Sequence, residues 1–194
     1  MVAVQQTVFL SDARVVWVGV TGEGARVHVE AAPERLYASV TELVTQGTHY
    51  AYVAEREGQH HVVSDGIAVA REAGPTDSLV TSPTGEVAYH TQRRAVGQVA
   101  PDDVIVAHDR EWPAPGFVES SLVCLDDAPH CAHLAVRGEE LVIVVDATHA
   151  IPFDLEEAVA RAARTASSAA MGDDAWLRAW LLGELRWFIA TRGR

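Results

Sequence analysis

Runs of alternating apolar and polar residues, separated by tight-turn signals, recur through the first 152 residues of this 194-residue chain. Successive side chains of a strand point to opposite faces, so this alternation is typical of strands with one buried face. The segment RVVWVGVTGEGARVHVE therefore predicts a first hairpin. We expect its apolar face to hold Val16, Val18, Val20, Ala25, Val27 and Val29.

Turn signals divide the following segments into further short strands. Residues 49–72 predict a three-stranded meander whose second turn is Asp65-Gly66, a dipeptide strongly favoured in two-residue hairpin turns. Residues 77–91 predict another strand pair, and residues 102–109 predict a short buried strand. We find no internal repeat in the sequence.

Two segments carry patterns typical of helices. In residues 33–46, between a proline and a glycine, apolar residues recur at helical spacing. They are Leu36, Val40, Leu43 and Val44. Residues 153–194 predict a C-terminal helical pair, and Gly193 is a suitable end for the second helix.

These patterns together predict an α+β fold. We expect an antiparallel, hairpin-rich sheet of about eight strands, one crossover helix over residues 33–46, and the C-terminal helical pair packed on the sheet. Residues 1–152 and 153–194 are expected to form parts of the same single domain, because 194 residues suffice for one sizeable core.

Composition excludes several chemistries. All 15 basic residues are arginine, and the chain has neither lysine nor asparagine, which fits a GC-rich bacterial or phage genome. Without lysine there is no phosphate-binding P-loop and no Schiff-base cofactor such as pyridoxal phosphate. A Cys-His-Asn arrangement is also excluded. With 27 acidic residues the net charge is −12, so nucleic acid is not expected as a partner.

The sequence also bears on location. The start of the chain lacks the basic segment and cleavage site of an export signal. No apolar run approaches the roughly 18 residues of a membrane span. We therefore expect a cytoplasmic protein without membrane contact, in which Cys124 and Cys131 are reduced rather than bridged.

A hairpin over residues 131–146 gathers the residues with the most chemistry. With Gly138-Glu139 as its turn, His133 pairs with Val144, and Cys131 with Asp146. The apolar alternation then puts Cys131, His133 and Asp146 together on the reverse face.

Three interpretations of this group are open. Asp146 orients His133, which activates the Cys131 thiolate; or the three residues bind zinc with His149 or His130; or they only hydrogen-bond one another on a half-covered face. The His and Asp on neighbouring strands resemble a hairpin of transglutaminase-like and arylamine N-acetyltransferase-like enzymes. Those enzymes carry the nucleophilic cysteine on an upstream helix, and this chain has no cysteine there.

Two further groups are candidate binding residues. The last helix carries Trp176, Trp180 and Trp187 and is apolar over more than one face, which favours either burial or contact with another chain. The adjacent Arg93 and Arg94 are candidates for docking a small anion or carboxylate.

The leading hypothesis is a non-catalytic binding or assembly protein that uses the tryptophan-rich last helix for self-association or for a protein partner. The alternative is a small hydrolase or acyl transferase that uses Cys131, His133 and Asp146, with or without zinc. No metal site is assigned, no cofactor is expected, a small-molecule ligand is left open, and the sequence does not decide whether the chain is an enzyme.

Overall fold

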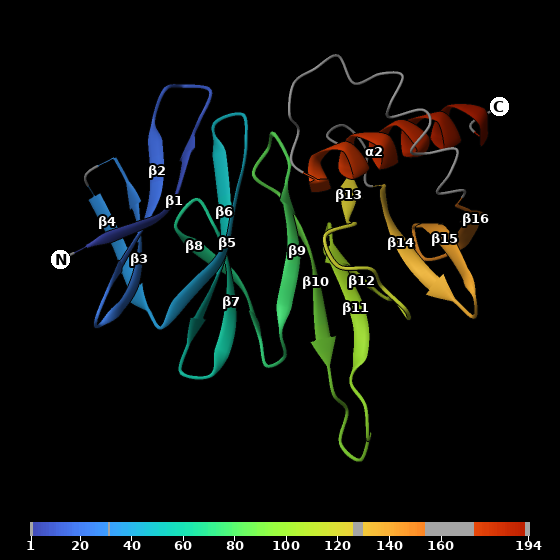
Figure 1. The fold of residues 1–194 in the computed structure, drawn as a ribbon, viewed down its shortest axis with the longest axis horizontal. Coiled ribbons are helices and arrows are strands. Elements are labelled where there is room, and N and C mark those ends of the chain that lie inside the picture. The colour runs from blue at the N-terminus through green and yellow to red at the C-terminus, as the bar shows by residue number, and fades with distance from the viewer. Residues whose placement is uncertain (1, 31, 126–129, 154–172, 193–194) are drawn as a thin grey trace. The chain divides into compact units, whose positions relative to one another are not determined.

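The computed structural model describes residues 2–30, 32–125, 130–153 and 173–192. These residues form four separate four-stranded antiparallel sheets and one helix (Figure 1). The chain divides into two compact units, Met1–Glu111 and Trp112–Arg194. The first three sheets belong to the first unit, whose boundary falls within the last strand of the third sheet.

The strands follow one another along the chain in sets of four. The first sheet holds β1 (Ala3–Phe9), β2 (Val15–Thr21), β3 (Gly24–Val29) and β4 (Ala32–Tyr37). The second holds β5 (Ser39–Gln46), β6 (His49–Arg56), β7 (Gln59–Ser64) and β8 (Ile67–Glu72). The third holds β9 (Thr76–Thr81), β10 (Val87–Arg93), β11 (Asp102–Ala107) and β12 (Arg110–Pro113). The fourth holds β13 (Val123–Cys124), β14 (Cys131–Arg137), β15 (Glu140–Val145) and β16 (His149–Pro152).

Every sheet is a meander in which each strand pairs with its neighbours in sequence. The first three sheets begin at Ala3, Ser39 and Thr76, at intervals of 36 and 37 residues. A four-stranded antiparallel meander is the unit from which β-propellers are built. The structure thus repeats one supersecondary unit, although the sequence shows no repeat, because the unit requires only alternation and turns rather than particular residues.

The predicted α+β fold with a single sheet of about eight strands is wrong, because the described residues are mostly β and form four separate sheets. The predicted strands themselves exist, but they pair only within sets of four. Alternation predicts which residues share a face of a strand, and it carries little information about which strands are hydrogen-bonded neighbours. Consecutive meanders therefore could not be distinguished from one continuous sheet.

The crossover helix predicted over residues 33–46 is also wrong, because this segment forms β4 and β5. A β-bulge explains the misleading pattern. Val40 pairs with Ala54 and Glu42 pairs with Val53, so Thr41 is an extra residue in β5. The bulge puts Val40 and Leu43, three residues apart, on the same buried face. In sequence this spacing is the same as that of a helix.

The first and second sheets share a core. The predicted face of the first hairpin is confirmed, since Val16 pairs with Val29, Val18 with Val27 and Val20 with Ala25. This face packs against the second sheet in a cluster of buried residues. The cluster holds Leu10, Val16, Val18, Ala25, Val27, Tyr37, Val40, Leu43, Tyr50, Tyr52, Ala54 and Val63.

The second sheet is buried on its other face as well. Ala51, Val53 and Val62 pack with Leu79 and Tyr89 of the third sheet. Strand β6 is therefore apolar on both sides, which is the pattern of a strand in the interior of a layered structure. Stacking of the meanders provides each of them with a core that it lacks alone.

The partly buried carboxylate of Glu42 also links the second and third sheets. Glu42, next to the bulge, accepts hydrogen bonds from the backbone N–H groups of Ser78 and Leu79, at 3.0 and 2.7 Å. Ser78 has a positive φ of 54°, which is unusual for a residue other than glycine. The carboxylate satisfies backbone donors where regular pairing of β9 is interrupted.

In the second unit, the helix α2 (Asp173–Arg192) packs on β13 and β14 (Figure 1). This helix confirms the second member of the predicted C-terminal pair, while the first member lies outside the described residues. The shared core consists of Val123, Leu125, Ala132, Leu134, Ile143, Val145, Leu181, Leu185 and Phe188. No helix among the described residues has the length and apolar character needed to cross a membrane.

Candidate functional site

The hairpin of β14 and β15 has the predicted register. Arg137 pairs with Glu140 and His133 pairs with Val144. The apolar face is buried as expected, except that Val136 is exposed, and it is α2 that covers this face. The reverse face is also buried, because Ala135, Val142 and Val144 form a small cluster of their own.

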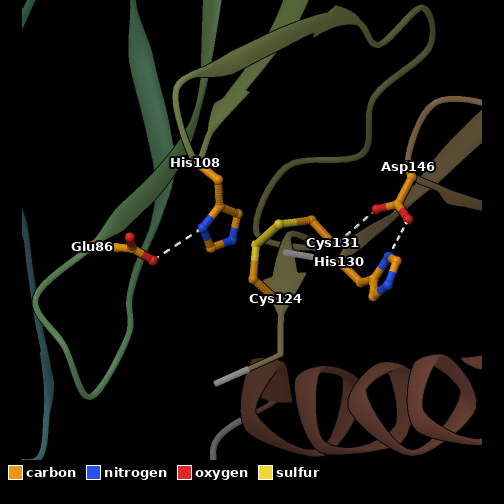
Figure 2. The surroundings of a disulfide bond; sticks show 6 residues. All are labelled: Glu86, His108, Cys124, His130, Cys131 and Asp146. Carbon is orange, nitrogen blue, oxygen red and sulfur yellow. Dashed lines mark hydrogen bonds and ion pairs between the residues drawn. A yellow bond between two sulfur atoms is a disulfide. The ribbon is translucent and has the colours of Figure 1, made fainter. Parts of the chain in front are cut away.

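The three predicted catalytic residues occupy different surroundings. The sulfur of Cys131 is bonded to that of Cys124, and the residue is 1% exposed. The His133 ring is buried at 5.4 Å from the ring of Phe117. The Asp146 carboxylate lies at the end of the hairpin and accepts hydrogen bonds from the His130 side chain, at 2.5 Å, and the Cys131 N–H, at 2.9 Å (Figure 2).

This geometry changes what the group can do. The expectation of reduced thiols is wrong, because Cys124 and Cys131 form a disulfide across directly paired positions of β13 and β14. A disulfide sulfur has no thiolate to act as a nucleophile. The hydrolase or transferase interpretation therefore requires prior reduction. Among the described residues, no group of three or more His, Cys, Asp or Glu side chains is arranged to hold a metal ion.

The His130–Asp146 pair has a counterpart in the second sheet. There, His49 contacts the Asp65 carboxylate at 2.6 Å, and the other carboxylate oxygen accepts the Tyr50 N–H at 3.1 Å. In both sheets the histidine stands at the start of the second strand and the aspartate begins the turn between the third and fourth strands. The two pairs thus occupy equivalent positions of the repeated meander.

The third sheet has the same pair with the residue types exchanged. Glu86, just before β10, contacts His108 at 3.1 Å, and His108 begins the turn between β11 and β12 (Figure 2). The equivalent positions of the first sheet hold Arg14 and Glu30. A basic and an acidic residue therefore recur at one place in all four meanders.

Backbone conformation explains the recurrence of this site. The turns of the last three sheets contain two successive residues with positive φ, namely Asp65-Gly66, His108-Asp109 and Asp146-Ala147. Two positive φ values are typical of the type I′ turn, which fits the twist of a hairpin. Only the first of these turns contains glycine, so the side-chain hydrogen bonds help to hold an unfavourable backbone. We interpret the acid–base pairs as structural clamps.

A sequence signal for these clamps exists and was missed. Histidine and aspartate are separated by 16 residues in both His49–Asp65 and His130–Asp146. Arg14 and Glu30 have the same separation. A spacing shared by only two residues, within strands of otherwise different sequence, is a weak signal. In the third sheet the longer connection between β10 and β11 changes this spacing.

The predicted arginine pair is divided in the structure. Arg93 binds the buried Glu72 through its Nε, at 3.1 Å, and its Nη2, at 2.8 Å. Its Nη1 contacts Glu111. These two acidic partners, Glu72 first, raise the pKa of Arg93 above its ordinary value. Arg94 is exposed. Arg93 is therefore engaged by acidic residues of its own unit rather than presented together with Arg94 to a ligand.

The tryptophans of α2 also differ from one another. Trp180 packs edge-on against Phe153 at a ring distance of 4.8 Å, within the core of the second unit. Trp187 is 62% exposed. The side chain of Trp176 lies outside what the structure describes. The helix thus presents at least one large aromatic side chain away from its own core.

His90, on β10, is clamped between two carboxylates. Its Nδ1 lies 3.0 Å from Asp77 on β9, and its Nε2 lies 3.2 Å from Asp103 on β11. An imidazole donates from both ring nitrogens only when it is protonated. Burial alone lowers the pKa of His90, but hydrogen bonds and charge from Asp77 and Asp103 outweigh burial and raise it above its ordinary value.

This clamp predicts a pH dependence of the first unit. A histidine whose pKa is higher in the folded than in the unfolded state stabilises the fold below its unfolded pKa, about 6.5. That contribution is lost as pH rises through the folded pKa, at up to about 1.4 kcal/mol per pH unit for one proton. Hydrogen exchange of β10 between about pH 5 and 8 measures the effect.

The His90→Gln variant is the control for this prediction, because glutamine does not titrate. The fall in the free energy of unfolding with rising pH is expected to become smaller in the variant. If the free energy of unfolding falls equally steeply with rising pH in both proteins, the assignment of the pH dependence to His90 is contradicted.

Comparison of the chain with protein-family models, with curated proteins and with solved structures finds no match. The functional interpretation therefore rests on the residues and geometry described above.

Proposed function

We propose that this chain is a non-catalytic assembly protein that associates with a second copy of itself through α2. The observation that carries the proposal is the 62% exposure of Trp187 on a helix whose other face is already buried in its own core. Tryptophan is enriched at the centres of protein interfaces, where its large surface is removed from water. We keep the cytoplasm as the compartment of this function, as the sequence leads us to expect.

The exposed residues of α2 form one face of the helix. Leu181, Leu185 and Phe188 are buried against the sheet. Over residues 180–191, the part of α2 whose side chains the structure describes, the exposed positions are Gly183, Arg186, Trp187, Ala190 and Thr191. Their spacing of three and four residues places them side by side along the helix. The helix therefore has a docking face opposite the face that holds it to its sheet.

The exposed face is complementary to a second copy of itself. Gly183 and Trp187 lie two residues before and two residues after position 185, so along the helix axis they are equally distant from the height of position 185. If two α2 helices cross antiparallel about a twofold axis at that height, Gly183 of each helix faces Trp187 of the other. A Cβ built on Gly183 meets no atom within 4 Å, so there is room over this position for an indole ring.

The Trp187→Ala variant tests this interface. An interface tryptophan at the centre of a contact typically contributes about 2 kcal/mol or more, so we expect the dissociation constant of the dimer to rise at least about 30-fold. Size-exclusion chromatography with light scattering measures it over a dilution series. Phe9→Ala, a variant at a 72% exposed aromatic residue of the first unit, is the matched control and is expected to leave the dimer intact.

A second variant tests the geometry of the contact. Gly183→Leu fills the space that we assign to the partner's indole, and leucine is a better helix former than glycine, so α2 itself is kept. The dimer is expected to weaken. An unchanged dissociation constant in both α2 variants would overturn the proposed interface.

A further inference from the structure

We propose that the Cys124–Cys131 disulfide is a redox-controlled latch for α2: reduction releases β13 and thereby loosens the helix that packs on it. This inference rests on the proposed function only in taking the Trp187 face of α2 as the surface that is regulated. The release of α2 itself is a property of the second unit and can be measured in a single chain.

The latch fastens an unusually short strand. Strand β13 has two residues and lies at the edge of its sheet, where Val123 pairs with Ala132 and Cys124 with Cys131. The Leu125 N–H, just after the strand, donates to the His130 carbonyl at 2.9 Å. The disulfide therefore joins the last residue of this short edge strand to β14 covalently.

The same segment supports the helix. Val123 and Leu125, on either side of Cys124, belong to the buried cluster with Leu181, Leu185 and Phe188 of α2. If β13 separates from β14, these two side chains leave the cluster and part of the apolar support of α2 is lost. The disulfide is thus coupled to α2 through contiguous packing.

The two cysteine residues differ in exposure, which defines the route of reduction. Cys124 is partly exposed, whereas Cys131 is 1% exposed. The thiolate of a dithiol reductant attacks Sγ of Cys124, the S–S bond breaks, and Cys131 leaves as a thiolate that takes up a proton. The second thiolate of the reductant then attacks the mixed disulfide and releases Cys124, which is protonated in turn. Two electrons pass to the protein, and the reductant leaves as its own disulfide.

The His130–Asp146 pair, at the end of the β14–β15 hairpin, does not depend on the disulfide. Asp146 holds the Cys131 N–H and the His130 side chain, so the β14 side of the disulfide stays anchored after reduction. On the β13 side, no side chain among the described residues holds the backbone of Cys124 in a corresponding way. Reduction is therefore expected to free β13 while the β14–β15 hairpin remains paired.

Hydrogen exchange with dithiothreitol as the probe tests the latch. In the reduced protein, amide exchange in β13 and α2 is expected to accelerate at least about tenfold, the equivalent of a local opening made easier by about 1.4 kcal/mol. Exchange in β6 and β7 of the first unit is expected to stay unchanged. The double variant Cys124→Ala with Cys131→Ala reproduces the reduced state without reductant.

Two results would overturn the latch. One is complete reduction, shown by titration of two thiols, without faster exchange in α2. The other is a disulfide that excess dithiothreitol reduces only when the second unit unfolds as a whole, which is the behaviour of a purely structural bridge. If the double variant does not fold, the reduced natural chain still gives both readings.

The latch and the proposed function fail separately. Repeating the exchange experiment in the Trp187→Ala background removes the proposed interface, and the acceleration in α2 is expected to persist there. If the natural chain dimerises but reduction does not accelerate amide exchange in α2, the latch alone is overturned. Redox-dependent exchange in a chain that never dimerises would overturn the proposed function alone.

Discussion

Replacing Arg93 by methionine is expected to lower the free energy of unfolding of the first unit by about 3–5 kcal/mol, because removal of one partner leaves a buried charge uncompensated. Glu72 is 7% exposed and receives two hydrogen bonds from Arg93 and one from the Tyr89 hydroxyl, at 2.9 Å. Without the guanidinium, the Glu72 carboxylate keeps only the neutral tyrosine. Hydrogen exchange of β10 peptides gives the free energy directly.

The neighbouring Arg94→Met variant is the matched control. Arg94 is exposed, so the same loss of charge is expected to change stability by less than about 0.5 kcal/mol. Adding Glu72→Gln to Arg93→Met removes the stranded charge and is expected to recover part of the loss. Similar effects at both arginines, or no recovery in the double variant, would show that Glu72 is not a buried charge held by Arg93.

Replacing Leu185 by alanine is expected to destabilise the second unit by about 2–5 kcal/mol, the range for truncating a fully buried leucine. Leu185 is 0% exposed and packs with Leu181 and Phe188 against β13 and β14. Because the chain has two compact units, unfolding of the whole chain need not be two-state. Exchange of β14 and β15 peptides therefore measures the second unit by itself.

Arg186→Ala, one residue along the same helix, is the control for this prediction. Arg186 is exposed, so its truncation is expected to cost less than about 0.5 kcal/mol. The first unit is expected to keep its stability in both variants. A Leu185→Ala effect no larger than that of Arg186→Ala would contradict the packing of α2 on the sheet.

Much of the local structure could be predicted from sequence, for a physical reason. Where a hairpin has a regular two-residue repeat and a tight turn, as in Val16–Val29 and Arg137–Glu140, pairing and faces follow from strand geometry. The Asp65-Gly66 turn is confirmed because both residues adopt the positive φ that its residue types favour. The last helix, α2, follows from its apolar residues at helical spacing.

The errors arise where structure depends on non-local pairing. The bulge at Thr41 makes Val40 and Leu43 imitate helical spacing, and no local feature of residues 33–46 reveals the partner strand that causes it. The division into four sheets depends in the same way on which strands meet.

In the candidate site, too, the local geometry could be predicted and the non-local pairing could not. The face shared by Cys131 and Asp146 could be derived from the hairpin, and the structure brings the Asp146 carboxylate to the Cys131 backbone. The bond between the two cysteines could not be derived, because it depends on the pairing of the two-residue strand β13, whose flanks carry no alternating pattern. His130 contacts Asp146 because the hairpin ends there, at a backbone with positive φ.

Sedimentation velocity of the oxidised chain over a wide concentration series tests the central claim most directly. The account predicts that the weight-average mass rises with concentration from that of one chain, 20.9 kDa, toward that of two. It also predicts that the Trp187→Ala variant stays at the lower mass over the same range. A natural chain that remains at the mass of one copy at every concentration would contradict self-association through α2.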